Sequence, residues 1–189
     1  FAFPDGTQWR SALLNLPVFP DNSPQGFYDR LLASKADPAT GKPDPAAMSA
    51  FQAAHPESAA AMALIKQHPP TLGFADSTFS SLITFFVVNE AGVRTPVRWA
   101  FVPLQTALPP RAGTTNSLFD ALVRQMRAGP LQWRLMLTVG QPDDPVHDAT
   151  LPWPSDRRTV DAGVLTLTGI ETDRAGNARD VNFDPLVLP

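Results

Sequence analysis

The sequence predicts an α+β fold in which helices come early in the chain and mostly antiparallel strands follow, and these strands could close into a barrel. Before residue 70 the apolar residues recur at helical spacing in alanine-rich segments, whereas from residue 78 onward they alternate or run continuously, as in strands. The 21 prolines stand at nearly every predicted boundary, and because proline lacks an N–H and fixes φ, they exclude long uninterrupted helices. The 189 residues suffice for a single domain with its own core.

The first part of the chain is predicted to hold a β-hairpin and then three short helices. Asp5-Gly6 is a strong signal for a tight hairpin turn. Ser23 and Pro24 are the residue types of an N-cap and a first helical position, and His68, followed by two prolines, ends the last of the three helices. The hairpin strands are predicted at 1–3 and 7–14, and the helices at 24–35, 45–54 and 57–67.

The remainder is predicted to be mostly strand, with one helix over 116–128. The segment 140–159 is rich in proline and aspartate, and so long a loop inside a compact domain is typical of a ligand site or a partner contact. The side chains expected on the buried face of the helix are Leu118, Phe119, Leu122, Val123 and Met126. The predicted strands are 84–88, 93–102, 131–139, 163–171 and 178–184.

Composition argues against several classes of protein. A net charge of −3 provides no basic field, so no nucleic-acid partner and no anionic membrane surface are predicted. No apolar run approaches the roughly 20 residues of a membrane span, and the start shows no signal pattern. The absence of cysteine excludes disulfides and a thiolate iron ligand, and it is compatible with a periplasmic or a cytoplasmic location.

Several polar and aromatic residues have a structural interpretation beside a functional one. His55 and His68 precede prolines at helix ends, and His147 lies in an acidic loop, so all three are interpreted as structural. Asn15 before a proline turn is by itself typical of a residue that bonds its own backbone. Most of the 12 phenylalanines are expected in the core.

A series of short motifs, in order along the whole chain, resembles the catalase-related haem peroxidases, the small relatives of catalase. The motifs are Asp5-Gly6 with Trp9, Asn15-Leu16-Pro17-Val18-Phe19, Pro24 with Phe27-Tyr28, Asp37 through Pro45, Phe51 with His55-Pro56-Glu57, Phe85 to Gly92, Leu118-Phe119-Asp120, Trp153-Pro154 and Asn182-Phe183-Asp184-Pro185.

The resemblance implies the antiparallel catalase β-barrel with flanking helices, binding one haem b. Asn15 matches the family's distal asparagine, whose amide hydrogen-bonds peroxide as the O–O bond polarises. Phe27 matches a phenylalanine against a haem face, and Phe183 matches the phenylalanine of a Phe-Asp-Pro turn in the cofactor pocket. Phe19, in the same motif as Asn15, is a further cofactor-binding candidate.

The same resemblance implies that two parts of the site lie beyond the given residues. The family's distal histidine would precede residue 1, and its proximal Arg-x-x-x-Tyr motif, which supplies the iron ligand, would follow residue 189. Tyr28 is the single tyrosine and lacks an arginine four residues before it, so it is not predicted as the ligand. We therefore expect a single catalase-like domain, truncated at both ends and inactive without its flanks.

The function implied is a haem-dependent peroxidase that reduces hydrogen peroxide or organic peroxides with a small reducing donor. An alternative is a non-catalytic β-barrel module that binds an apolar ligand, since a barrel rich in phenylalanine can enclose one. A third is a folded but inactive relative. Self-association into a homo-oligomer stays open.

Overall fold

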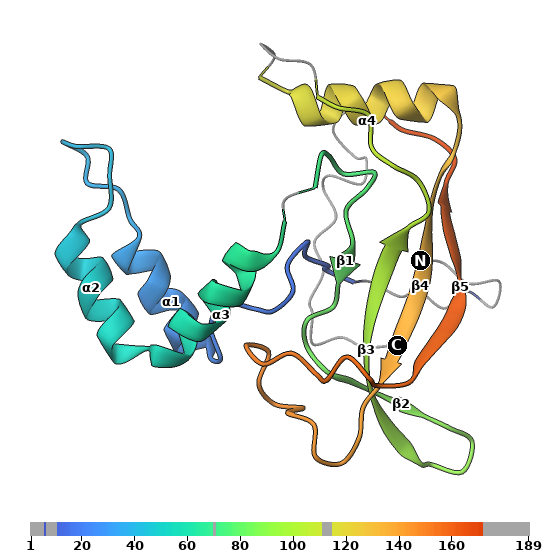
Figure 1. Cartoon of the computed structure of the whole chain (residues 1–189), viewed down its shortest axis with the longest axis horizontal. Coiled ribbons are helices and arrows are strands. Elements are labelled where there is room, and N and C mark those ends of the chain that lie inside the picture. Colours follow the sequence, from blue (N-terminus) through green and yellow to red (C-terminus); the bar gives the residue numbers. More distant parts are fainter. Residues whose placement is uncertain (1–5, 7–10, 70, 111–114, 172–189) are drawn as a thin grey trace.

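The computed structural model of this chain describes residues 6, 11–69, 71–110 and 115–171. Its helices are α1 (Pro24–Ala33), α2 (Pro45–Ala54), α3 (Pro56–Gln67) and α4 (Ser117–Ala128), and its strands are β1 (Phe79–Ser80), β2 (Phe85–Val88), β3 (Arg94–Pro103), β4 (Leu131–Val139) and β5 (Thr159–Leu167). Figure 1 shows α1, α2 and α3 as an arm to one side of the sheet, with α4 lying across one end of it. The predicted α+β class is confirmed.

The first two helices begin at the residues that the sequence indicates. The Ser23 side chain accepts a hydrogen bond from Gly26 N at 3.1 Å, and the Asp44 side chain accepts one from Ala46 N at 2.9 Å. A proline follows each cap at the first helical position, where its missing N–H costs nothing. Local sequence is therefore enough to start α1 and α2.

The ends of these helices are also set by local chemistry. α1 ends at Ala33, two residues before the predicted end, and the Ser34 N–H closes its last turn. α2 and α3 are separate helices because His55 precedes Pro56, and a residue before proline is driven out of the helical region. His55 accordingly has φ −127° and ψ 68°, which turns the chain between the two helices.

The strands form one antiparallel sheet in the order β1-β3-β4-β5, and β2 pairs with another part of β3. The predictions for β2, β3 and β4 are correct to within a residue at each end. β1, with only two residues, was not predicted, because its pairing with Phe101 and Ala100 leaves no periodic signal in the sequence.

β5 differs from the prediction of a strand over 163–171. It begins at Thr159 and ends at Leu167, so the loop before it ends at residue 158. The reason is pairing: β4 is nine residues long, and β5 pairs with it from Leu131↔Leu167 to Thr138↔Thr159. The ladder with β4 sets the boundary of β5, and neither the turn residues nor the apolar pattern of the segment reveals it.

The core lies between the sheet and α4. Leu122 and Met126 of α4 pack against it as predicted. Leu118 and Phe119 are 42% and 61% exposed, so the prediction that they are buried is wrong, although Phe119 still contacts Phe74 on the side of α4 that faces the sheet. Ala121, with its small side chain, is the buried residue of α4. The central core residues are Ala75, Phe101, Leu131 and Trp133.

The predicted hairpin at the start of the chain lies largely outside the described residues, as does the strand predicted at 178–184. Of segment 7–14, the described residues contribute one isolated bridge, in which Leu14 and Ser80 exchange backbone hydrogen bonds of 3.1 and 2.8 Å. Over the described residues β1 and β5 are the outermost strands of the sheet path, and closure into a barrel stays a prediction.

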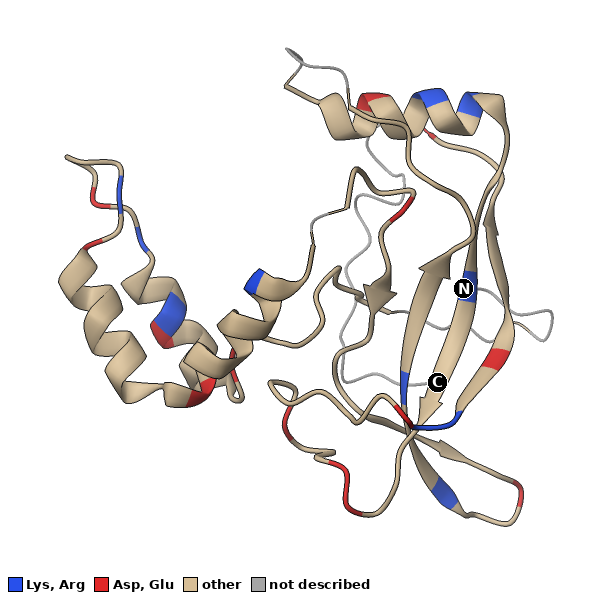
Figure 2. Cartoon of the chain, in the orientation of Figure 1, with Lys and Arg blue, Asp and Glu red and all other residues tan. Residues whose placement is uncertain are grey.

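Charged side chains occur on the arm, on α4, in the loops and on the strands of the sheet (Figure 2). Acidic side chains mark the long loop between β4 and β5 (Figure 2). Within the part of the chain that the structure describes, no helix has the length and apolar character needed to cross a membrane.

Candidate functional site

The side chain of Asn15 lies in a network of hydroxyl groups. Its Nδ2 donates to Thr71 Oγ1 at 3.1 Å and to Ser77 Oγ at 3.0 Å. The Ser77 hydroxyl donates its single proton to the Gly73 carbonyl at 2.7 Å, so toward Asn15 it can only accept. This arrangement fixes the orientation of the amide, with nitrogen toward the hydroxyls.

The carbonyl end of the same amide is unpaired within the described part of the chain. Among the described residues Asn15 Oδ1 is buried and has no hydrogen-bond partner. A buried carbonyl without a partner costs about 1–3 kcal/mol, and in native proteins such a group needs an explanation. The resemblance implies that this amide hydrogen-bonds peroxide, without saying through which atom. Both N–H groups bond Thr71 and Ser77, so the atom left for a ligand is the acceptor Oδ1.

Phe19 and Phe27 come together as an aromatic pair, referred to below as the Phe19–Phe27 pair. Their ring centroids are 5.4 Å apart with the planes tilted by 50°, a favourable arrangement for two aromatic rings. Phe19 N donates to Ala149 O at 2.9 Å, which joins this turn to the long loop, and Phe27 projects from α1 with 38% of its surface exposed. Two of the four predicted site residues are thus neighbours, and Phe183 lies outside the described residues.

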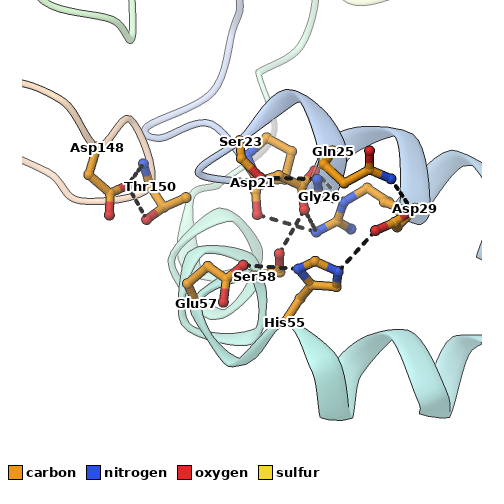
Figure 3. Close-up of polar contacts among 12 residues, drawn as sticks. Asp21, Ser23, Gln25, Gly26, Asp29, His55, Glu57, Ser58, Asp148 and Thr150 are labelled. Atoms are coloured by element: carbon orange, nitrogen blue, oxygen red, sulfur yellow. Dashed lines mark hydrogen bonds and ion pairs between the residues drawn. The ribbon is translucent and has the colours of Figure 1, made fainter.

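A buried carboxylate holds the turn after Phe19 against the helical arm. The Asp21 side chain is 0% exposed. It accepts hydrogen bonds from Arg30 Nε at 2.8 Å, from Arg30 Nη2 at 3.0 Å and from the Ser58 hydroxyl at 2.7 Å. Ser58 belongs to α3 and Arg30 to α1, so one carboxylate joins the turn to both helices (Figure 3). The cluster thus connects α1, the helix that carries Phe27, with the turn after Phe19.

His55 takes part in the same region through structural contacts. Its Nδ1 lies 3.1 Å from Glu57 Oε1, and its Nε2 lies 3.4 Å from Asp29 Oδ2 (Figure 3). Its ring stacks on Phe51, with ring centroids 4.7 Å apart. These contacts occupy both ring nitrogens and one face of the imidazole, so His55 has a structural role that requires no ligand. Over the described residues no group of three or more His, Cys, Asp or Glu side chains could hold a metal ion.

The long loop is fixed by a buried ion pair. The Asp144 side chain is 1% exposed, and Arg157 Nε donates to both of its oxygens, at 3.1 and 2.8 Å. The hydrogen bonds from Arg157 hold the pKa of Asp144 below its usual range, and in return raise the pKa of Arg157. The loop predicted to contact a ligand or partner is therefore a fixed element that reaches Phe19 through Ala149.

An apolar groove of about 400 Å³ opens between α4 and the sheet. Phe119 of α4, 61% exposed, contacts Phe74 there with ring centroids 5.2 Å apart. A groove of this kind suits an apolar ligand. Its lining residues are Leu13, Phe74, Phe79, Phe101, Phe119, Leu122, Trp133, Leu165 and Leu167.

Sequence reasoning missed the residues that hold the candidate site together. Thr71 and Ser77 lie 56 and 62 residues from Asn15, and Ser58 lies 37 residues from Asp21. No motif links such pairs, because a side-chain contact between distant segments appears only when the fold brings them together. Asp21 is the one residue of this cluster that the sequence weakly indicates, since an acidic side chain there stands between apolar residues and turn residues.

The fold is that of the catalases. The structure superposes on a fungal catalase with a TM-score of 0.69 at 18% sequence identity, covering 83% of this chain and 35% of that one. It superposes on catalase A from Saccharomyces cerevisiae with a TM-score of 0.70 at 17% identity, covering 85% of this chain and 37% of that one. No family model matches the sequence.

The chain is a homologue of the catalase-related peroxidases over its full length, as the motif series indicated. It is 37% identical to the catalase-related peroxidase of Synechococcus elongatus over 193 residues, covering 100% of this chain and 57% of that protein. It is 24% identical to the catalase-related peroxidase of Mycolicibacterium paratuberculosis, covering 98% of this chain and 60% of that protein. The chain thus spans less than two thirds of the length of these relatives.

Proposed function

We propose that this chain forms walls of the haem pocket in a peroxidase that reduces hydrogen peroxide or a small organic peroxide. The observation that carries the proposal is the 37% identity to a catalase-related peroxidase along the entire chain, together with the Phe19–Phe27 pair. In the proposed reaction hydrogen peroxide takes up two electrons and two protons and yields two molecules of water. The electrons come from a small reducing donor outside this chain.

The residues of this chain fit the faces of haem b and not its iron. The Phe19–Phe27 pair offers apolar aromatic surface, and the exposed part of Phe27 can still pack on a ligand. Phe183 is proposed as a third aromatic contact. The donor types that bind haem iron are poorly suited here: Tyr28 is 55% exposed on α1, and His55 contacts two carboxylates.

Asn15 is proposed as the polar residue of the pocket. Bound haem supplies the redox chemistry that breaks the O–O bond. The contribution of Asn15 is orientation: its unpartnered Oδ1 can accept a hydrogen bond from the O–H of a peroxide, while Thr71 and Ser77 hold the amide in place. Closure of the strands into a catalase-like barrel around this pocket belongs to the same proposal.

The test uses the full-length protein that carries this chain. After reconstitution with haem b it is expected to show a Soret absorption band and to oxidise a dye only when peroxide is present. A matched variant, Phe27→Ala, removes one proposed haem contact and should weaken haem binding, whereas Phe86→Ala removes a comparably exposed ring from β2, 39% against 38%, and should not. A protein that takes up no haem under these conditions would contradict the proposal.

The second candidate function is binding of an apolar ligand without redox chemistry. The apolar groove between α4 and the sheet favours it, because aromatic and aliphatic side chains line it throughout. A fluorescent fatty acid tests this candidate: tight uptake that is lost in Phe119→Ser, in a protein that takes up no haem, would favour it over the peroxidase.

A further inference from the structure

Arg98, on β3, binds the backbone of the long loop between β4 and β5. Its Nη1 donates to Leu151 O at 2.9 Å, and its Nη2 donates to Pro145 O and to Asp148 O, both at 3.1 Å. One guanidinium therefore binds three backbone carbonyls along seven residues of the loop. The sheet provides the fixed base for this contact, since β3 is paired on both sides.

The guanidinium also stacks on the loop. Its central carbon lies 4.7 Å from the centroid of the Trp153 ring, and its Nε donates to Thr84 at 3.4 Å. Burial lowers the pKa of Arg98, while Asp144 and Asp148 act in the opposite direction. A planar group with five N–H donors can meet three carbonyls and an aromatic face together, and an ammonium on a flexible stem cannot.

The loop that Arg98 holds is the one that positions Phe19. Ala149, whose carbonyl accepts the Phe19 N–H at 2.9 Å, lies directly after Asp148 and two residues before Leu151. Arg98 thus binds the backbone on both sides of the carbonyl that Phe19 uses. Phe19 in turn packs on Phe27.

We infer that Arg98 is a positioning residue for the Phe19–Phe27 pair, acting through the segment 145–151. The inference rests on the proposed function for its consequence at haem, but the mechanical link from Arg98 to Phe19 is a property of this chain. Three variants test it: Arg98→Met, Arg98→Lys, and Arg134→Met as the matched control. Arg134 is an arginine of the same sheet whose ion pair with Asp161 is 46% exposed on both sides.

The first measurement is amide hydrogen exchange in the haem-free protein. In Arg98→Met the Phe19 amide is expected to exchange about tenfold faster or more, because loss of charge-assisted hydrogen bonds opens the loop locally. Arg98→Lys should restore part of the protection, and Arg134→Met should match the unmodified protein. An unchanged Phe19 amide in Arg98→Met would overturn the inference, and so would equal acceleration at Phe19 and along the β4–β5 ladder, which indicates general destabilisation.

The second measurement is the Soret band of the haem-loaded full-length protein. Arg98→Met is expected to displace or broaden the band relative to the unmodified protein, with Arg98→Lys intermediate and Arg134→Met unchanged. A band identical in all four proteins would remove the link to haem. If the unmodified protein shows no band, the proposed function fails, and the exchange result still decides whether Arg98 positions Phe19.

Discussion

At the scale of single residues, the amide of Asn15 has one orientation because Ser77 donates its only proton to Gly73. The motif implies that the amide hydrogen-bonds peroxide, and within the described residues the geometry leaves a buried acceptor, Oδ1, for that contact. Which end of an amide is free depends on hydroxyl groups far away in the sequence. The motif could indicate that Asn15 matters, and it could not indicate which atom would meet a ligand.

Asn15→Ala is predicted to slow peroxide cleavage more than it weakens haem binding. The variant removes the Oδ1 acceptor, and loss of one such hydrogen bond corresponds to about a tenfold lower rate. It also removes two donated hydrogen bonds, which contribute about 1–2 kcal/mol to the free energy of unfolding, while removal of the unpartnered Oδ1 acts in the opposite direction.

Stopped-flow absorbance after mixing with peroxide measures the rate, and haem titration measures the affinity. The exposed Asn22 provides a control, because Asn22→Ala should change neither. A loss of stability with an unchanged rate would mean that Asn15 only joins two segments of the chain.

Asp21→Ala is predicted to destabilise the arm strongly. The variant leaves the Arg30 guanidinium, 16% exposed, without its buried partner, and breaking a buried ion pair in this way costs about 3 kcal/mol or more. Ser58→Ala, which removes one hydrogen bond to the same carboxylate, should cost only about 1 kcal/mol. Urea unfolding of both variants gives the comparison, and equal small effects would show that the cluster contributes little.

At the scale of elements, local signals predicted the helices well. Ser23-Pro24 and Asp44-Pro45 start α1 and α2, and His55 before Pro56 separates α2 from α3, because capping and proline geometry act within a few residues. The burial of side chains on α4 was predicted less well. Leu118 and Phe119 are exposed, and the small Ala121 is the buried residue, because burial depends on how the helix packs on the sheet.

Pairing between strands decided the elements that sequence could not predict. β1 exists because Phe79 and Ser80 meet β3, and β5 starts at Thr159 because β4 extends that far. A bulge between Leu135 and Met136 changes the register within the same ladder. The partner strand determines where such strands begin and end, so the sequence of the segment itself does not predict these boundaries.

The loop between β4 and β5 is predicted to lose stability in acid through Asp144. Its pKa is lowered by hydrogen bonds from Arg157, so the carboxylate contributes stability that is present above the unfolded-state pKa of 3.8 and is lost as pH falls through the lower folded value. The thermal midpoint should therefore fall on acidification, and in Asp144→Asn this part of the pH dependence should be absent, with a lower midpoint at neutral pH.

Thermal unfolding across the acid range checks this expectation. Asp143→Asn is the matched control, since Asp143 is exposed beside Asp144 and should leave the curve unchanged. If the thermal midpoint of Asp144→Asn fell on acidification as it does in the unmodified protein, the ion pair with Arg157 would not contribute to the pH dependence of stability.

At the scale of the whole molecule, the segment that carries Phe19 runs from the sheet, where Leu14 bridges to Ser80 of β1, to the start of the helical arm, and the long loop reaches Phe19. Asp21 attaches this segment to the arm, and Ala149 attaches it to the loop. The proposed haem contact therefore lies where three parts of the fold converge. The single-domain organisation, the compartment and self-association stay predictions from sequence.

A structure of the haem-loaded full-length protein would show directly where the porphyrin binds. We expect the porphyrin in van der Waals contact, within about 4 Å, with the Phe19–Phe27 pair, and Asn15 Oδ1 turned toward the space above the ring. A porphyrin bound elsewhere, for example in the apolar groove under α4, with neither phenylalanine in contact, would contradict this expectation.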